Sequence, residues 1–185
     1  MFNLDRFAED CLDAQRGSDS QQAIRALLTE AVATPNDIIT ALGEPSQAGV
    51  HKLYHTEELT ILNVVWAPLM TIRPHEHNMV ATIGIYSGRE DNIFWRRNGN
   101  RIEAAGAKAL CLGDVETLGK DIVHSVTNPI EKFTGALHIY GGDFFEVERH
   151  EWEPETLTEC AYDMENTHRT FREANERYPA SAVKP

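Results

Sequence analysis

The segment Arg73–Asn78, with the sequence RPHEHN, places two histidines two positions apart in a stretch of extended character. Side chains in a strand alternate between its two faces, so His75 and His77 point the same way. Two imidazoles on one face form half of a metal site, and the other half has to come from a different strand. His124, in the segment Asp121–Asn128, is the best candidate for the third ligand. The sequence therefore predicts a metal site in which these three histidines meet.

Residues from about 46 to 151 have the sequence character of β-strands. Runs rich in β-branched and aromatic residues, such as Leu59–Trp66 and Phe133–Tyr140, recur along this region. Glycine or proline stands at most of the joints between the runs. Short strands with frequent turns and no helices between them predict a mainly β domain, built as an antiparallel sandwich or barrel.

Helical periodicity flanks the strand region on both sides. Residues 1–45 carry apolar side chains at helical spacing, and residues 152–178 return to this period with Pro154 suited to a first turn. The chain is therefore predicted to form a single domain over residues 1–185, in which helices cover a β-barrel core. Residues 180–185 are expected to be mobile.

The composition fits a globular protein and argues against several classes of function. The chain has 185 residues, of which 42% are hydrophobic, and its formal net charge is −12. An acidic chain argues against a nucleic-acid partner, and no apolar run reaches the roughly 20 residues that span a bilayer, so neither nucleic acid nor a membrane is expected as a partner. The three cysteines are widely spaced, which indicates free thiols in a reducing compartment. Because the N-terminus lacks a signal-peptide pattern, we expect a cytoplasmic protein. We expect its partner to be a small molecule.

The histidines also carry a resemblance to a known superfamily. The run His75–His77 with the later Gly88 resembles the first cupin motif, and the segment Gly113–Asn128 resembles the second. The glutamate ligand that usually follows the second histidine is missing from residues 78–82. Within the cupins, a three-histidine site without this glutamate resembles the thiol dioxygenases, the cysteine dioxygenase and 3-mercaptopropionate dioxygenase family. The segment Leu137–Asp143 is similar to the same family.

The resemblance, which covers roughly residues 50–145, implies a cupin double-stranded β-helix, also called a jelly-roll barrel. It implies Fe(II) held by the three histidines, although three imidazoles also accept other divalent metals. The implied reaction oxidises a small thiol-bearing organic acid with O2 to a sulfinic acid. His138 and Tyr140 match the family's histidine and tyrosine beside the metal and are the expected catalytic residues. Ala136 replaces the serine that precedes them, which shortens the family's hydroxyl relay.

The segment expected to bind the substrate departs from the family pattern. The family holds the substrate carboxylate with an arginine or glutamine shortly after a tyrosine on an early strand. Tyr54 matches that tyrosine, but Thr56 stands near the anchor position and cannot form a charged clamp. Arg73 shares strand parity with the histidine pair and is the predicted substitute. Alternatively, Pro74 disturbs the strand and leaves Arg73 in an ion pair at the rim.

Two other functions are compatible with the same residues. A three-histidine cupin can use O2 on a substrate without a thiol, for example to cleave a dicarbonyl compound. A cupin can also bind a metal or a small molecule without turnover. Oxygen consumption with a panel of thiols distinguishes these possibilities. The protein is expected to be a monomer or a homodimer.

Overall fold

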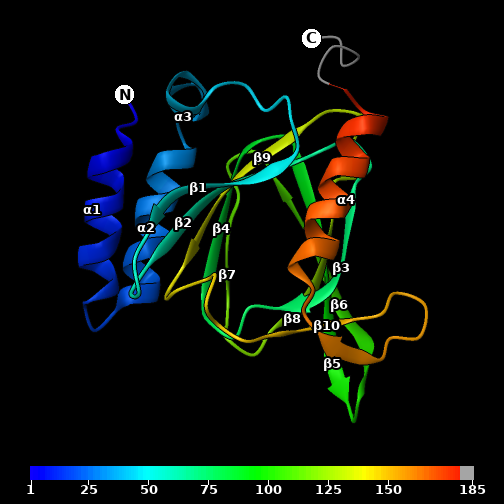
Figure 1. Ribbon diagram of the computed structural model, residues 1–185. Helices are drawn as coiled ribbons and strands as arrows, with labels where there is room; N and C mark the ends of the chain where they lie inside the picture. The colour runs from blue at the N-terminus through cyan, green and yellow to red at the C-terminus, as the bar shows by residue number, and fades with distance from the viewer. Residues whose placement is uncertain (180–185) are drawn as a thin grey trace.

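Two antiparallel β-sheets face each other in the computed structural model, which describes residues 1–179 (Figure 1). The helices are α1 (Leu4–Gln15), α2 (Ser20–Val32), α3 (Pro35–Leu42) and α4 (Met164–Arg177). The strands are β1 (Gly49–His55), β2 (Thr60–Trp66), β3 (Thr71–Glu76), β4 (Ala81–Ser87), β5 (Arg89–Asn98), β6 (Arg101–Cys111), β7 (Val115–Leu118), β8 (Val123–Thr127), β9 (Thr134–Tyr140), β10 (His150–Trp152) and β11 (Glu159–Ala161). The expectation for residues 180–185 lies outside the described part of the chain.

The order of the strands defines the fold. One sheet has the order β1-β2-β9-β4-β7, and the other has the order β11-β10-β3-β8-β5-β6. In each sheet a late strand lies between two early ones: β9 separates β2 from β4, and β8 separates β3 from β5. This interleaving is the topology of a jelly roll. The predicted double-stranded β-helix with N-terminal helices and a C-terminal helix is therefore confirmed.

The N-terminal helices cover the outer face of the first sheet (Figure 1). Their apolar stripes pack on outward-facing side chains of β2, β4 and β9, so every residue of β2 and β9 is buried. Burial on both faces explains why these strands read as continuous apolar runs and not as alternating ones. Gly84 allows α2 to approach closely, because a Cβ at that position would lie 2.7 Å from Leu28 Cγ.

Helix α4 packs against the interior of the barrel and contributes to its core. Phe171 stacks on Trp66, with ring centroids 5.6 Å apart. The Asn175 side chain forms two hydrogen bonds with the backbone of Ala48, accepting from its N–H (2.8 Å) and donating to its carbonyl (2.9 Å). These contacts fix α4 to the segment that precedes β1. None of the helices within residues 1–179 combines the length and apolar character required to cross a membrane.

The region before α4 differs from the prediction of one helix over residues 152–178. Pro154 does lie in a helical turn, which is closed by a hydrogen bond from the Leu157 N–H to the Glu153 carbonyl (2.8 Å). Leu157 has a φ of 54°, so the turn does not continue as a helix. Instead, β10 and β11 pair across this turn, and β10 joins the second sheet beside β3. Helix α4 therefore begins only at Met164.

Candidate metal centre

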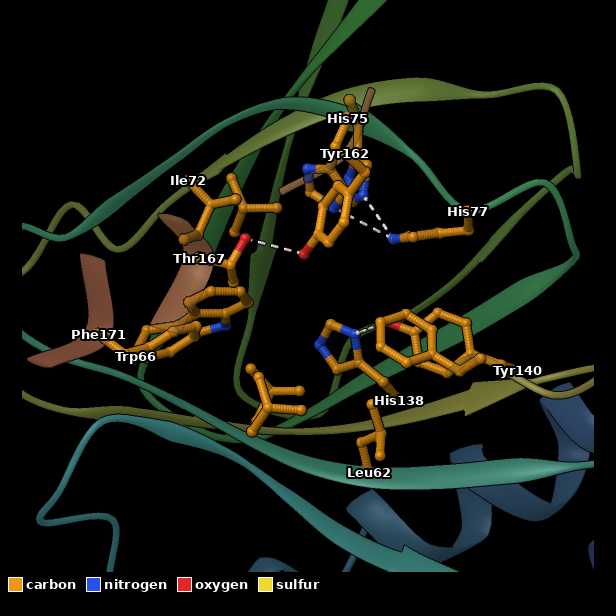
Figure 2. Close-up of a pocket in the computed structure, with 15 residues that line it drawn as sticks. Leu62, Trp66, Ile72, His75, His77, His138, Tyr140, Tyr162, Thr167 and Phe171 are labelled. Carbon is orange, nitrogen blue, oxygen red and sulfur yellow. Dashed lines mark hydrogen bonds between the residues drawn. The ribbon is translucent and has the colours of Figure 1, made fainter. Parts of the chain in front are cut away.

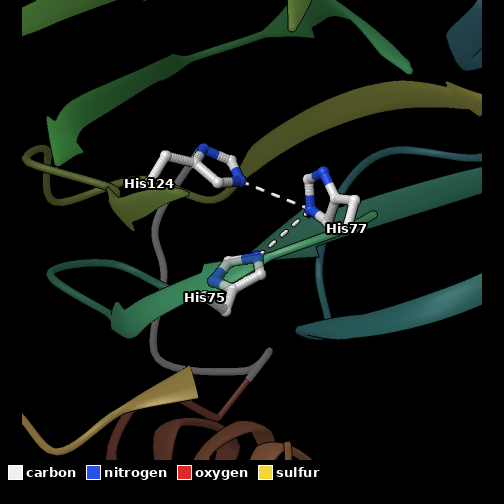
Figure 3. Close-up of side chains that lie close together, drawn as sticks. All are labelled: His75, His77 and His124. Carbon is white, nitrogen blue, oxygen red and sulfur yellow. Dashed lines mark hydrogen bonds between the residues drawn. The ribbon is translucent and has the colours of Figure 1, made fainter. Parts of the chain in front are cut away.

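The three histidines predicted as ligands meet inside the barrel (Figure 3). The Nε2 atoms of His75 and His77 are 3.2 Å apart, and those of His77 and His124 are 3.3 Å apart. Strand pairing causes the convergence, because His75 on β3 is the register partner of His124 on β8. His77 follows directly after the end of β3. All three side chains are buried. The prediction that they come together is confirmed.

In His75 and His124, the ring nitrogen that points away from the cluster, Nδ1, forms a hydrogen bond with an oxygen atom. His75 Nδ1 faces the Arg73 carbonyl at 3.0 Å, and His124 Nδ1 faces Asn92 Oδ1 at 2.7 Å. Carbonyl oxygens only accept, so both rings carry their proton on Nδ1 and direct the Nε2 lone pair into the cluster. The Asn92 amide is itself oriented, because its Nδ2 donates to Glu90 Oε1 at 2.9 Å.

The separations between the nitrogens suit a shared metal ion. Metal–nitrogen bonds of about 2.1 Å place two ligand nitrogens about 3.0 Å apart at octahedral angles and about 3.4 Å apart at tetrahedral angles. The two separations of 3.2 and 3.3 Å lie between these limits. All three ligand nitrogens lie within 4.8 Å of one another, so the cluster could hold one divalent ion and leave positions on it for other ligands. Imidazole donors suit iron, zinc, nickel and cobalt alike, so they do not select the ion.

The protonation state of the cluster also suits a metal. Burial lowers the pKa of His75 to about 4; the hydrogen bond to Arg73 opposes this shift and the charge of Arg149 adds to it. Burial is also the main cause that lowers the pKa of His77 and His124 well below the usual value, with smaller effects from the neighbouring histidines. All three rings are neutral near pH 7 as a consequence, and neutral imidazole is the form that binds metals.

A buried carboxylate, Glu90 on β5, connects the cluster with the predicted catalytic pair. Glu90 accepts hydrogen bonds from Trp66 Nε1 and Asn92 Nδ2, both at 2.9 Å, and lies 3.6 Å from His138 Nε2. His138 Nδ1 is in turn 3.1 Å from the hydroxyl of Tyr140. Both members of the predicted pair line the same cavity as the three histidines. Their catalytic role stays a prediction.

Two pKa shifts describe this network. Burial alone would raise the pKa of Glu90, but His138 and the hydrogen bonds from Asn92 and Trp66 lower it below its usual value. Glu90 is therefore a buried anion. Burial raises the pKa of Tyr140, so its hydroxyl keeps its proton at neutral pH.

A cavity of about 40 Å³ adjoins the histidines (Figure 2). Most of its wall is apolar, formed by side chains that include Leu62, Val64, Trp66, Ile72, Val126 and Phe171. Figure 2 shows the Tyr162 ring near His75, with its hydroxyl accepting a hydrogen bond from Thr167 at 2.9 Å. A space of this size holds a few water molecules or one small ligand.

Arg149 is a buried cation beside this cavity, with 6% of its surface exposed. Its guanidinium carbon lies 4.1 Å from the ring centroid of Phe144 and 4.3 Å from that of Tyr162, and both rings line the cavity. Nη1 donates to the Phe144 carbonyl at 2.5 Å. Nε and Nη2 are buried and have no hydrogen-bond partner within residues 1–179. Unpaired buried donors on a charged group cost stability, which indicates a place for an anionic ligand.

Arg73, the predicted carboxylate anchor, does not take the interior direction expected from strand parity. Its Nη1 donates to Glu151 Oε1 and to Glu153 Oε1, both at 3.0 Å. The register of β3 against β8 shifts between Ile72 and His75, so alternation counted back from the histidines fails at this position. The guanidinium is held in an ion-pair cluster outside the residues that line the cavity.

Tyr54 and Thr56, predicted near the substrate, also lie elsewhere. Tyr54 on β1 packs against the apolar cluster beneath the N-terminal helices. The Thr56 hydroxyl accepts from the backbone N–H groups of Glu58 (3.3 Å) and Leu59 (3.1 Å) in the turn between β1 and β2. The side chain from β1 that does line the cavity is Val50. A substrate role for Tyr54 or Thr56 stays a prediction that their placement does not support.

Sequence reasoning missed both Glu90 and Arg149. Glu90 follows the turn at Gly88 closely, where acidic residues are common, and only its strand parity with Asn92 indicates burial. Arg149 lies in a stretch that forms no strand of its own between β9 and β10. The position of Arg149 near the cavity depends on the tertiary fold, so no local sequence pattern predicts it.

The comparisons with known proteins agree on little beyond the fold. No protein-family model and no curated protein matches this chain. An RmlC-like cupin family protein from Methanocaldococcus jannaschii has a TM-score of 0.46 at 14% identity, over 55% of this chain and 85% of that chain. The DMSP lyase DddQ from Ruegeria pomeroyi has 0.47 at 17% identity, over 59% and 53%. A cupin superfamily protein from Desulfitobacterium hafniense has 0.44 at 15% identity, over 54% and 82%. These likenesses concern the fold alone and carry no argument about substrate or reaction.

Proposed function

We propose that this protein is a metal-dependent thiol dioxygenase that oxidises a small thiol-bearing organic acid with O2 to a sulfinic acid, using Fe(II). One observation carries the proposal: three neutral imidazoles line a small cavity, and a buried cation, Arg149, stacks on two aromatic rings of the cavity wall, Phe144 and Tyr162. Two of its guanidinium nitrogens have no hydrogen-bond partner within residues 1–179. The cluster suits an ion that binds a thiolate, and the cation suits a carboxylate. The sequence resemblance supplies the reaction class.

Different residues would bind the metal ion, bind the substrate carboxylate and exclude water. His75, His77 and His124 would hold the ion, which when bound would stabilise the substrate thiolate and supply the redox chemistry with O2. Arg149 would hold the substrate carboxylate with the Nε and Nη2 donors that have no partner in residues 1–179. The apolar wall of the cavity would keep bulk water from the reacting sulfur.

Tyr140 and His138 would form a hydrogen-bonded pair beside the reacting atoms, in which the Tyr140 hydroxyl donates a hydrogen bond to His138 Nδ1. The Tyr140 hydroxyl lies 3.1 Å from His138 Nδ1, which is placed to accept its hydrogen bond. In the overall reaction one thiol and one O2 give one sulfinic acid, and both oxygen atoms end on sulfur. No external reductant is needed, because the sulfur supplies all four electrons that reduce O2. The Tyr140 hydroxyl at the cavity wall would stabilise the charged substrate by a hydrogen bond while its sulfur is oxidised.

Oxygen uptake by the Fe(II)-loaded protein tests the proposal. We expect uptake with one or more thiols that carry a carboxylate, such as cysteine or 3-mercaptopropionate, and a product that has gained two oxygen atoms by mass spectrometry. His124→Ala should abolish uptake, whereas the exposed His51→Ala should not. Uptake that requires a dicarbonyl compound, or ligand binding without any uptake, would contradict the proposal.

A further inference from the structure

One buried charge, Glu90, faces N–H donors from two functional branches of the cavity wall. It has 0% of its surface exposed, and its carboxylate meets Trp66 Nε1 (2.9 Å), Asn92 Nδ2 (2.9 Å) and His138 Nε2 (3.6 Å). An ionised carboxylate only accepts hydrogen bonds. Trp66 and Asn92 therefore present donors to it. His138 Nε2 has no hydrogen-bond partner within residues 1–179, and the nearby negative charge of Glu90 favours a proton on it.

The first branch runs to the metal cluster. Because Asn92 presents its Nδ2 to Glu90, its Oδ1 is turned to His124 Nδ1, 2.7 Å away. His124 must then carry its proton on Nδ1, which leaves Nε2 able to bind a metal. A reversed Asn92 amide would offer a donor to Nδ1, so the proton would move to Nε2 and block the ligand position.

The second branch runs to Tyr140. Because Glu90 favours a proton on His138 Nε2, the other ring nitrogen, Nδ1, is unprotonated and faces the Tyr140 hydroxyl at 3.1 Å. The hydroxyl then donates to Nδ1 and keeps its oxygen lone pairs for other partners. Ala136, two residues before His138 on β9, offers no hydroxyl for this purpose. The polar neighbour of His138 Nε2 is Glu90 from the opposite sheet.

We propose that Glu90 is a positioning residue that sets the tautomers of His124 and His138 together. A single buried carboxylate thereby prepares the metal ligand and the partner of Tyr140 for their roles. The catalytic consequence rests on the proposed function, but the tautomers themselves exist in the metal-free protein and are measured there.

Glutamine at this position cannot satisfy both branches. Its one carbonyl oxygen replaces only one carboxylate oxygen, and an amide N–H group replaces the other. If the N–H group faces Asn92, the Asn92 amide has to reverse and the His124 tautomer inverts. If it faces His138 instead, the His138 tautomer inverts. Glu90→Gln is therefore expected to invert at least one of the two rings.

Nitrogen-15 NMR of the metal-free protein tests this inference, since protonated and unprotonated ring nitrogens have distinct chemical shifts. In the wild type we expect His124 protonated on Nδ1 and His138 protonated on Nε2. In Glu90→Gln we expect one or both to invert, with a loss of about tenfold or more in Co(II) affinity when His124 is the inverted ring. Glu103→Gln, an exposed carboxylate on β6, is the matched control and should leave both tautomers unchanged.

Two results would overturn the inference. One is a wild-type protein in which either ring has the opposite tautomer, a result that does not require any variant to fold. The other is a folded Glu90→Gln protein that keeps both wild-type tautomers. Lack of thiol oxidation by the metal-loaded protein would contradict the proposed function and leave the tautomer measurement unaffected.

Discussion

The Nε and Nη2 donors of Arg149, which have no partner in the described residues 1–179, lead to a prediction about substrate choice. Replacing Arg149 with methionine removes the charge while keeping an unbranched apolar side chain between Phe144 and Tyr162. A charge-assisted hydrogen bond contributes about 1.5–3 kcal/mol, so KM for a carboxylate-bearing thiol should rise about tenfold to a hundredfold. KM for cysteamine, a thiol without a carboxylate, should change little. Steady-state oxygen uptake with both substrates makes the comparison.

Arg96→Met is the matched control for this experiment, because Arg96 is an exposed arginine paired with Glu103 on the β5–β6 hairpin. It should leave both KM values unchanged. An equal loss for the two thiols in Arg149→Met would show that Arg149 supports the fold and does not hold a carboxylate.

The buried histidines predict how the stability of the metal-free protein depends on pH. Burial lowers the pKa of His75 from 6.5 to about 4 in the folded state. Between these values the unfolded chain binds a proton that the folded chain does not, so the free energy of unfolding falls as the pH is lowered. His75 alone should contribute up to about 3 kcal/mol of stability. This contribution is fully present above pH 6.5 and is lost as the pH falls to about 4.

Urea unfolding at several pH values, with metal removed by a chelator, measures this dependence. His75→Gln should show a shallower slope than the wild type, since one titrating group is missing. Equal slopes for the two proteins would contradict the folded-state pKa of His75. The surface variant His51→Gln serves as the control.

Single residues also show where alternation along a strand is a reliable guide. Alternation holds for His138 and Tyr140, which are two residues apart on β9 and face the same way, with His138 Nδ1 3.1 Å from the Tyr140 hydroxyl. It failed for Arg73, because the irregularity next to Pro74 changes the register of β3 against β8. Parity holds along an unbroken ladder and is lost across a proline bulge.

Among the elements, α4 depends on a two-point contact with the start of the barrel. Asn175 is the only described side chain bonded to both backbone groups of Ala48, so Asn175→Ala leaves a partly buried N–H and carbonyl unpaired. We expect the free energy of unfolding to fall by about 1–3 kcal/mol. Denaturant unfolding gives the value, with Glu176→Ala on the exposed face of α4 as the control. A loss no larger than that of the control would mean that Asn175 does not fix the helix.

The elements differ in how far sequence alone could predict them. Strands β2 and β9 of the first sheet were recognisable because burial on both faces gives long apolar runs such as Leu59–Trp66. Strands β10 and β11 were not, because Pro154 and its acidic neighbours also suit the first turn of a helix. What decides between the alternatives is the pairing of Glu151 with His75 on β3, a long-range contact that no local pattern contains.

At the scale of the whole molecule, the jelly roll explains why the metal ligands meet and why the rest of the site was harder to predict. His75 and His124 lie on adjacent strands of one sheet, His77 follows directly after the first of them, and motif spacing was enough to connect the three. Glu90 reaches His138 across the space between the two sheets, and Arg149 enters from a loop. Contacts of this kind depend on how the sheets close on each other, which single-sequence patterns do not specify.

The central claim is that His75, His77 and His124 together bind one metal ion. Titration of the metal-free protein with Co(II), followed by absorption spectroscopy and calorimetry, tests it directly. We predict one ion per chain for the wild type, and a loss of at least about a hundredfold in affinity for each single alanine variant that still folds, as judged by circular dichroism. Unchanged Co(II) affinity and stoichiometry in folded His75→Ala, His77→Ala and His124→Ala proteins would contradict the claim.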